Sequence, residues 1–220
     1  VDQALADFRQ LVVLQAQSPR PHVLLAQVQS AAKDHAAAAD SLRKVLAIQP
    51  NMLEAQRALA GLAVESGDFP AALAVARAVQ TQRPKEAVGF LLEGEIEAAQ
   101  KRWPQTALAL ERGLKQAPSP EPARRAHAAY GAAGDAAAQE RVDASWLKGH
   151  PTDPVFRLYL GDLSTRKGDF VAAEKMYADV VRIDPANAVA LNNLAWVGGR
   201  LKRPDAVRHA EKAVALAPDQ

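Results

Sequence analysis

The chain has 220 residues, of which 49% are hydrophobic but only 5% aromatic, so its core must be built mainly from Ala, Leu and Val. Its 27 basic and 25 acidic residues are spread along the whole length without a long run of one sign, which argues against a nucleic-acid-binding arm or an acidic tail. It has no cysteine, which excludes disulfides, thiolate metal ligands and cysteine nucleophiles.

No apolar run reaches the ~18 residues that a transmembrane helix needs, so we expect no direct membrane insertion of this segment. The sequence begins with Val1 and not with methionine. We therefore expect it to be part of a longer protein, in which any targeting signal lies outside this segment.

A repeat organises the chain. Residues 1–18 have the spacing of a second helix from a truncated repeat, with Ala4, Phe8 and Leu11 in core positions. After them a proline recurs every 33 or 34 residues, at Pro50, Pro84, Pro118, Pro151, Pro185 and Pro218. Self-similarity at this period is typical of a stacked helix-turn-helix array. The predicted units are residues 19–52, 53–86, 87–120, 121–153, 154–187 and 188–220, which form one continuous solenoid.

The turn inside each unit has a fixed chemistry. In SGDFPAALAVARAVQTQRP, residues 66–84, and KGDFVAAEKMYADVVRIDP, residues 167–185, a glycine suits the left-handed end of a first helix and an aspartate then caps the second. The remaining carboxylates of the latter stretch are then solvated rather than catalytic. Small residues recur in one column of each helix, which allows close packing. These columns hold Ala26, Ala60, Gly94, Gly161 and Ala195 in the first helices, and Ala38, Ala72, Ala173 and Ala206 in the second.

The unit at residues 121–153 is irregular, because it lacks one residue in its first helix. Counting back from Pro151 places Gln139 and Asp143 in core columns, whereas a shift of one residue places Ala138 and Val142 there. In either register the unit is expected to bury less apolar area than its neighbours, so we expect a bend or soft joint at residues 118–150; a regular repeat with a tolerant sequence is the alternative. Gly198 and Gly199 indicate a frayed helix end or a space beside Trp196.

Patterns typical of catalysis do not occur in the sequence. The histidines His22, His35, His127, His150 and His209 lie in different units, and no HExxH, Gly-rich phosphate loop or G-x-S-x-G is present. We therefore expect no enzyme active site, no metal site and no cofactor in this segment.

The whole chain resembles the tetratricopeptide repeat (TPR): a 34-residue unit, a Leu-Gly or Leu-Ala pair in the first helix, alanine in the second and a terminal proline. NNLAW at residues 192–196 and YLGDL at residues 159–163 are similar to bacterial TPR first helices. The resemblance implies an all-α fold, a right-handed α-solenoid of stacked helix-turn-helix units. More weakly, the chain resembles large bacterial TPR proteins of envelope and exopolysaccharide systems, including the PEP-CTERM (exosortase) TPR lipoproteins.

In TPR proteins the first helices line a concave groove that binds a peptide or protein. The resemblance thus implies a protein-binding site at Arg20, Gln27, Arg57, Glu65, Leu91, Glu95, Arg125, Leu158, Asp162, Arg166, Asn192, Trp196 and Arg200. Asn192, Trp196 and Arg200 are the candidate hot spot, because Trp and Arg dominate interface energetics; packing of Trp196 between helices is the alternative. The set does not match the Lys/Asn clamp with which chaperone-binding TPR domains hold a C-terminal carboxylate.

These observations favour a non-catalytic protein-interaction scaffold in a bacterial envelope, exopolysaccharide or protein-sorting system. Its expected location is periplasmic or membrane-anchored, with a cytoplasmic location as the alternative. The second hypothesis is the substrate-recruiting region of an enzyme, such as a glycosyltransferase, whose catalytic domain lies outside the segment. RNA binding is disfavoured by Glu54, Glu65, Glu95 and Asp162 in the groove. End-to-end self-association through the truncated repeats is a further expectation.

Overall fold

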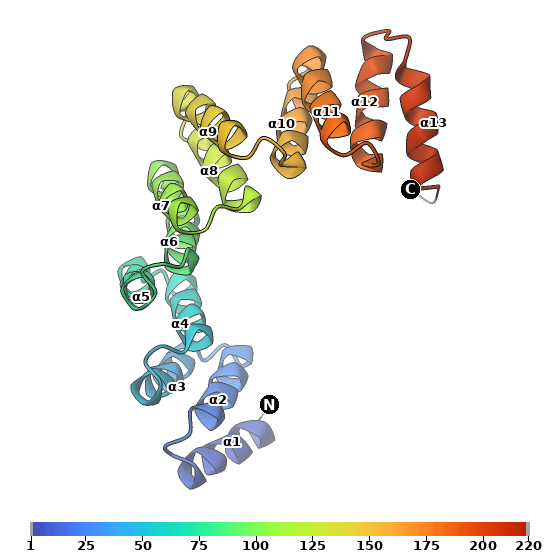
Figure 1. The fold of residues 1–220 in the computed structure, drawn as a ribbon. Helices are drawn as coiled ribbons and strands as arrows, with labels where there is room; N and C mark the ends of the chain where they lie inside the picture. The colour runs from blue at the N-terminus through green and yellow to red at the C-terminus, as the bar shows by residue number, and fades with distance from the viewer. Residues whose placement is uncertain (1, 219–220) are drawn as a thin grey trace. The chain divides into compact units, whose positions relative to one another are not determined.

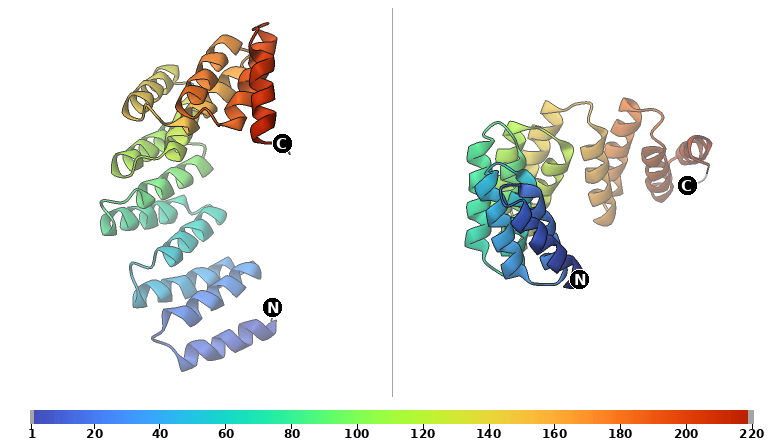
Figure 2. Two further views of the ribbon diagram at one scale, coloured as in Figure 1. Left: turned by 45° about the vertical axis from the view of Figure 1, so that its right-hand side comes forward. Right: turned by 90° about the horizontal axis from the view of Figure 1, so that it is seen from below.

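The computed structural model describes residues 2–218, which form thirteen α-helices and contain no strand (Figure 1). Consecutive helices form antiparallel pairs, which Figure 2 shows from two further sides. The predicted all-α solenoid is confirmed. The helices are α1 (Asp2–Leu14), α2 (Pro19–Ala31), α3 (His35–Ile48), α4 (Leu53–Glu65), α5 (Phe69–Gln82), α6 (Val88–Ala99), α7 (Trp103–Gln116), α8 (Pro120–Ala132), α9 (Ala136–Gly149), α10 (Pro154–Arg166), α11 (Phe170–Ile183), α12 (Ala188–Arg200) and α13 (Ala206–Leu216).

The helices group into two compact units. Unit 1 comprises Val1–Pro118 and Ala129–Gly134, and unit 2 comprises Ser119–Ala128 and Asp135–Gln220. The close pairs are α2 with α3, α4 with α5 and α6 with α7 in unit 1, and α10 with α11 and α12 with α13 in unit 2. We call the first helix of each pair an A helix and the second a B helix. The assignment of single repeats to residue ranges remains a prediction.

Aspartate caps begin the B helices, as predicted. Asp34, Asp68, Asp135 and Asp169 each accept a hydrogen bond from the backbone N–H three residues later, at 2.9 to 3.1 Å. The residue before each of these caps has a left-handed backbone, with φ of 61° at Lys33 and 75° to 78° at the three glycines Gly67, Gly134 and Gly168. Lys101 and Lys202 have the same conformation, with φ of 57° and 56°. The turn geometry is therefore common to these units, whether or not glycine is present.

Small residues allow the helices of a pair to approach closely. A Cβ atom added to Gly161 would lie 2.6 Å from the ring of Tyr177, and one added to Gly94 would lie 3.1 Å from Leu110. On the B helices, Ala38, Ala72 and Ala173 are fully buried. At these positions the predicted small residues lie in the contacts between A and B helices.

The region of α8 and α9 distinguishes the two registers that the sequence left open. Ala138 and Val142 are buried, whereas Gln139 and Asp143 are only partly buried, so the core positions follow the register shifted by one residue. In unit 2 the indole of Trp146 is buried, stacks on His150 with ring centroids 3.8 Å apart, and donates a 2.7 Å hydrogen bond to Asp153. Aromatic burial here was not foreseen. The expected soft joint at residues 118–150 stays a prediction.

Gly198 also differs from expectation. It is buried within α12, and an added Cβ would lie 3.1 Å from the Cβ of Ala206. It therefore serves the contact between α12 and α13, and is neither a frayed end nor a space beside Trp196. Gly199 next to it is exposed, with open space around it.

Candidate functional site

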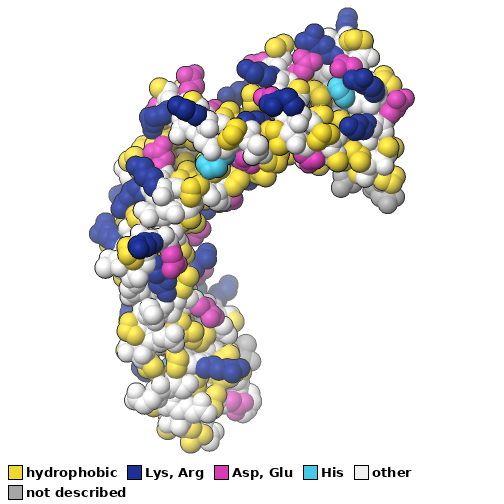
Figure 3. Space-filling model, viewed as in Figure 1, with side chains coloured by type: hydrophobic (Ala, Val, Ile, Leu, Met, Phe, Trp, Pro, Cys, Tyr) yellow, Lys and Arg dark blue, Asp and Glu magenta, His cyan; other side chains and the backbone are white. Residues whose placement is uncertain are grey.

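The surface of the protein mixes the two signs of charge. On the face drawn in Figure 3, Lys and Arg side chains lie among Asp, Glu and hydrophobic side chains. Within residues 2–218, each helix is too short or too polar to span a bilayer, and no three His, Asp or Glu side chains come together as metal ligands would. A candidate site must therefore be sought in clefts between helices.

The thirteen predicted binding residues all lie on first helices. Arg20 and Gln27 are on α2, Arg57 and Glu65 on α4, Leu91 and Glu95 on α6, Arg125 on α8, Leu158, Asp162 and Arg166 on α10, and Asn192, Trp196 and Arg200 on α12. The structure brings four of them together in unit 2, where Asp162, Arg166, Asn192 and Trp196 line one cleft between α10 and α12. We call this the α10–α12 cleft.

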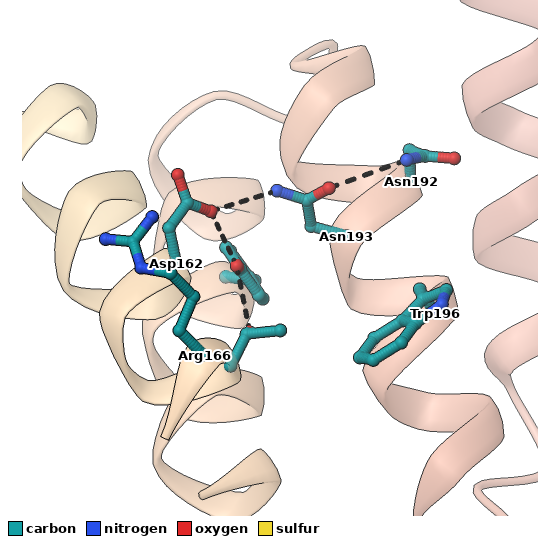
Figure 4. A pocket seen from close by; sticks show the side chains of 7 residues that line it. Asp162, Arg166, Asn192, Asn193 and Trp196 are labelled. Carbon is teal, nitrogen blue, oxygen red and sulfur yellow. Dashed lines mark hydrogen bonds between the residues drawn. The ribbon is translucent and has the colours of Figure 1, made fainter. Parts of the chain in front are cut away.

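The α10–α12 cleft has a volume of about 370 Å³ and is completed by Thr165, Tyr177 and Asn193 (Figure 4). At its base the hydroxyl of Tyr177 donates a 2.7 Å hydrogen bond to Oδ1 of Asp162. The amide of Asn193 donates to the same oxygen at 3.3 Å, and Thr165 Oγ1 lies 3.2 Å from the Tyr177 hydroxyl. Because Oδ1 receives two donors from two other helices, the Asp162 carboxylate is held in a fixed orientation.

The electrostatics of this network favour a neutral tyrosine. Burial raises the pKa of Tyr177 to about 12, and the neighbouring Asp162 acts in the same direction. The phenol therefore stays protonated and remains a donor to the carboxylate at any physiological pH. The second oxygen of Asp162, Oδ2, has no hydrogen bond to another residue in the described range 2–218. It is available to a donor from outside the chain.

Trp196 forms one wall of the cleft. Its side chain is 52% exposed, and its ring meets Phe170 of α11 edge-on, with centroids 5.6 Å apart. The guanidinium of Arg200 lies 5.3 Å from the Phe170 ring and 5.7 Å from the Trp196 ring. Trp196 is thus supported from one side and open on the other, whereas Arg200 stacks behind it and does not line the cleft.

The predicted residues of unit 1 are more scattered. Gln27 and Glu65 line a second cleft of about 370 Å³ between α2, α3 and α4, which we call the α2–α4 cleft. Arg57 instead lies 4.0 Å from Glu95, as an exposed ion pair between α4 and α6. Leu91 is partly buried and lies against Gly113 of α7.

Three other predicted residues stand apart from the two clefts. Arg20 is exposed on α2, and Arg125 lies 3.7 Å from Glu121 one turn earlier on α8. Leu158 packs against the core cluster that contains Tyr177 and Leu194 in unit 2. These residues lie on the expected helices, but they do not line either of the two clefts described above.

Sequence reasoning missed Tyr177 and Asn193. Tyr177 was treated as a core residue of a B helix, and its hydroxyl reaches the cleft only because Gly161 lets the ring approach α10. Asn193 follows Asn192 in the NNLAW motif, but the predicted groove positions of this unit were Asn192, Trp196 and Arg200. A tyrosine in a core position of the B helix, facing a glycine of the A helix, is the sequence pattern that could have predicted this role of Tyr177.

A buried polar cluster in unit 2 was also missed. His127 is 5% exposed, its Nδ1 lies 2.8 Å from the Tyr159 hydroxyl, and its Nε2 lies 3.5 Å from Asp143. Burial lowers the pKa of His127 to about 4, with Lys167 acting in the same direction. Burial raises the pKa of Asp143 to about 6, against the effect of Lys167. The imidazole is therefore neutral at pH 7 and can accept a hydrogen bond from Tyr159 on Nδ1 while Nε2 faces the carboxylate.

Antiparallel helix pairs, capped turns and small-residue contacts make this protein an all-α solenoid of helix-turn-helix repeats. Residues 30–96 match the family model described as tetratricopeptide repeat. The resemblance to the tetratricopeptide repeat that the sequence suggested is thus found in residues 30–96. None of the curated proteins compared with it matches in sequence.

Solved structures share the fold at low sequence identity. The Pseudomonas aeruginosa PilF structure has a TM-score of 0.51 and 18% identity, over 92% of this chain and 93% of its own. PilW, described as a widely conserved type IV pilus biogenesis factor, has a TM-score of 0.54 and 14% identity, over 92% and 94%. Yeast Tom70 has a TM-score of 0.54 and 11% identity, over 98% of this chain and 55% of its own. At such identities the likeness concerns the fold alone.

Proposed function

We propose that the protein is a non-catalytic interaction scaffold that binds a peptide or protein segment along its A helices, with the α10–α12 cleft as a principal contact. The observation that carries the proposal is the half-exposed Trp196 beside the fixed carboxylate of Asp162. An aromatic wall and an oriented acceptor, both held before binding, are what a protein partner needs for affinity and for orientation.

The binding free energy expected from covering Trp196 is large enough for a hot spot. A tryptophan buries roughly 150–250 Å² when fully covered, and about half of the Trp196 side chain is still exposed. Covering the remaining ~100 Å² of apolar surface would contribute about 2–3 kcal/mol at ~25 cal/mol per Å². Because Phe170 and Arg200 already hold the ring, little side-chain entropy would be lost on binding.

The biological setting we propose is a bacterial envelope, exopolysaccharide or protein-sorting system, with a periplasmic or membrane-anchored location. Its support is the similarity of NNLAW and YLGDL to bacterial TPR helices. A pilus biogenesis factor with the same fold over most of its length is compatible with this setting.

The test is affinity capture from an extract of the cells that encode the protein, with the whole chain as bait. Trp196→Ala and Arg166→Glu alter the α10–α12 cleft, and Leu108→Ala is the matched control. Leu108 is 55% exposed, close to the 52% of Trp196, but lies on the B helix α7 of unit 1. We expect a protein retained by the wild type and by Leu108→Ala to be lost with both cleft variants, after circular dichroism has shown that all are folded. Equal retention by all four baits would refute this binding surface.

A further inference from the structure

Gly61 occupies a place where the fold gives no reason for glycine. It lies inside α4, four residues before the helix ends, and its backbone is not left-handed. A Cβ added to Gly61 would meet no atom within 4 Å, whereas one added to Gly94 or Gly161 would be 3.1 or 2.6 Å from a neighbouring side chain. Glycine within a helix costs about 1 kcal/mol relative to alanine. The stability lost at Gly61 is therefore not compensated by packing within the chain.

The space above Gly61 belongs to the α2–α4 cleft. The floor of this cleft is apolar and comes from three helices, with Val23 and Ala26 on α2, Leu42 on α3, and Ala58 and Leu62 on α4. Its volume of about 370 Å³ is enough for a large aliphatic or aromatic side chain with part of its backbone. A side chain at position 61 would project into this volume, since nothing else fills it.

The rim of the cleft is acidic. Glu54 and Glu65 line it and are both exposed, while no Lys or Arg does so. Glu65 has His35 Nδ1 at 3.3 Å, and Glu54 forms no ion pair with a residue in the described range. Arg57 lies on the same helix, but its guanidinium is directed to Glu95 of α6. The rim thus presents two carboxylates without a compensating strong cation.

The two carboxylates are separated along the helix axis. Eleven residues of helix correspond to roughly 16 Å, at about 1.5 Å per residue. An extended segment that follows α4 covers this distance in about five residues, at about 3.3 Å per residue. Side chains four residues apart lie on one face of an extended segment, together with the side chain midway between them. Basic residues at this spacing are about 13 Å apart, and the length of a Lys or Arg side chain covers the remainder, so both can face the carboxylates while the middle residue enters the cleft.

We propose that the α2–α4 cleft binds an extended partner segment through one large apolar side chain seated over Gly61, with a Lys or Arg on each side facing Glu54 and Glu65. This rests on the proposed function, since it assigns a partner chemistry to the A helices of unit 1. Glycine at position 61 then serves recognition: it keeps open the space that the partner side chain occupies. The acidic rim selects a basic segment and repels an acidic one or a nucleic acid.

The experiment uses the whole chain and fluorescein-labelled synthetic peptides in fluorescence anisotropy titrations. The probe has two Lys residues four positions apart with one Leu midway between them in a Gly/Ser sequence, and its control has Glu in place of both Lys. We expect the Lys peptide to bind at least about tenfold more tightly than the Glu peptide, with an affinity that falls as salt rises. Equal binding of the two peptides, or no binding of the Lys peptide, would overturn the proposal.

Two variants separate the apolar and the charged contributions. Gly61→Met fills the cleft, and we expect it to weaken binding of the Lys peptide at least about tenfold. The melting temperature of this variant should equal that of the wild type or exceed it. The double variant Glu54→Gln, Glu65→Gln is expected to abolish the preference for Lys over Glu and to remove most of the salt dependence. Unchanged affinity with Gly61→Met, or an unchanged preference with the double variant, would refute the inference; should Gly61→Met not fold, the double variant still decides.

Trp196→Ala serves to separate this inference from the proposed function. It alters the α10–α12 cleft of unit 2 and should leave binding of the Lys peptide unchanged. If the peptide experiment fails while Trp196→Ala still loses the captured partner, only the α2–α4 assignment is wrong. If Trp196→Ala retains the partner and the peptide results are as expected, the proposed role of the α10–α12 cleft is wrong instead.

Discussion

The hydroxyl of Tyr177 hydrogen-bonds Asp162 at 2.7 Å, and the Tyr177 ring lies where a side chain on Gly161 would have to be. One tyrosine of α11 therefore fills the core between two helices and also orients the acceptor of the α10–α12 cleft. The geometry of the cleft depends on the close approach of α10 and α11. Substitutions in the core between α10 and α11 should therefore change binding at the α10–α12 cleft.

Gly161→Ala tests this dependence. The new Cβ would be 2.6 Å from the Tyr177 ring, so the ring or the helix must move. We expect a loss of about 1–3 kcal/mol in the free energy of unfolding, as for overpacking of a core, measured by urea denaturation. Gly61→Ala is the control, because its methyl group meets open space and should raise stability by about 1 kcal/mol. Equal effects of the two substitutions would contradict the role of Gly161.

Tyr177→Phe removes the donor and keeps the ring. We expect a loss of about 1 kcal/mol in stability, because Asp162 Oδ1 then receives only the longer bond from Asn193. Urea denaturation measures the stability, and capture of a partner by the whole chain measures the cleft. The variant should retain less partner than the wild type although Trp196 is untouched. A variant with full stability and full retention would show that the hydroxyl does not orient Asp162.

Most of the fold could be predicted from patterns among residues close in sequence. Caps at Asp68 and Asp169 could be predicted from the sequence because a cap needs only residues within one turn. Small-residue columns could be predicted because two packed helices with a regular repeat must meet at the same position in each unit. The left-handed turn at Lys33 was not foreseen, since the sequence shows lysine where other units have glycine.

The site was predicted only in part, because it depends on contacts between distant residues. Asp162 and Trp196 were placed on the correct helices, but the interaction of Asp162 with Tyr177 depends on packing across the α10–α11 pair. The cluster of His127 with Tyr159 joins residues 32 apart, in a unit whose register the sequence left open. Gly61 was overlooked because an empty space leaves no pattern in a sequence.

The three lysines in left-handed turns are candidates for stabilisation. Lys33, Lys101 and Lys202 have φ between 56° and 61°, a region that disfavours any residue with a Cβ. We expect each Lys→Gly substitution to raise the free energy of unfolding by about 0.5–1 kcal/mol. Gly168→Lys, at the equivalent position of unit 2 with φ of 78°, should lower it by a similar amount. Urea denaturation measures all four, and a loss of stability with the Lys→Gly variants would contradict the expectation.

His127 and Asp143 make opposite contributions to the pH dependence of stability. The pKa of His127 falls from 6.5 to about 4 on folding, so its contribution is present above about pH 6.5 and is lost as the pH falls toward 4. The pKa of Asp143 rises from 3.8 to about 6, so its contribution is present below about pH 4 and is lost as the pH rises toward 6. Glu140 raises the pKa of Asp143 further, and Lys167 acts on both residues.

Between pH 4 and 6 the folded pair holds its proton on Asp143, whereas the unfolded pair holds it on His127. Because the number of bound protons is the same in both states, this pair should add almost no slope to the stability of the wild type in that window. Variants at one residue of the pair separate the contributions of His127 and Asp143 to the pH dependence of stability. With Asp143→Asn, stability should rise with pH from about 4 to 6.5; with His127→Gln, it should fall as the pH rises from about 4 to 6. Urea denaturation at several pH values measures the slopes relative to the wild type. Slopes of the same sign in the two variants would contradict the opposite pKa shifts of His127 and Asp143.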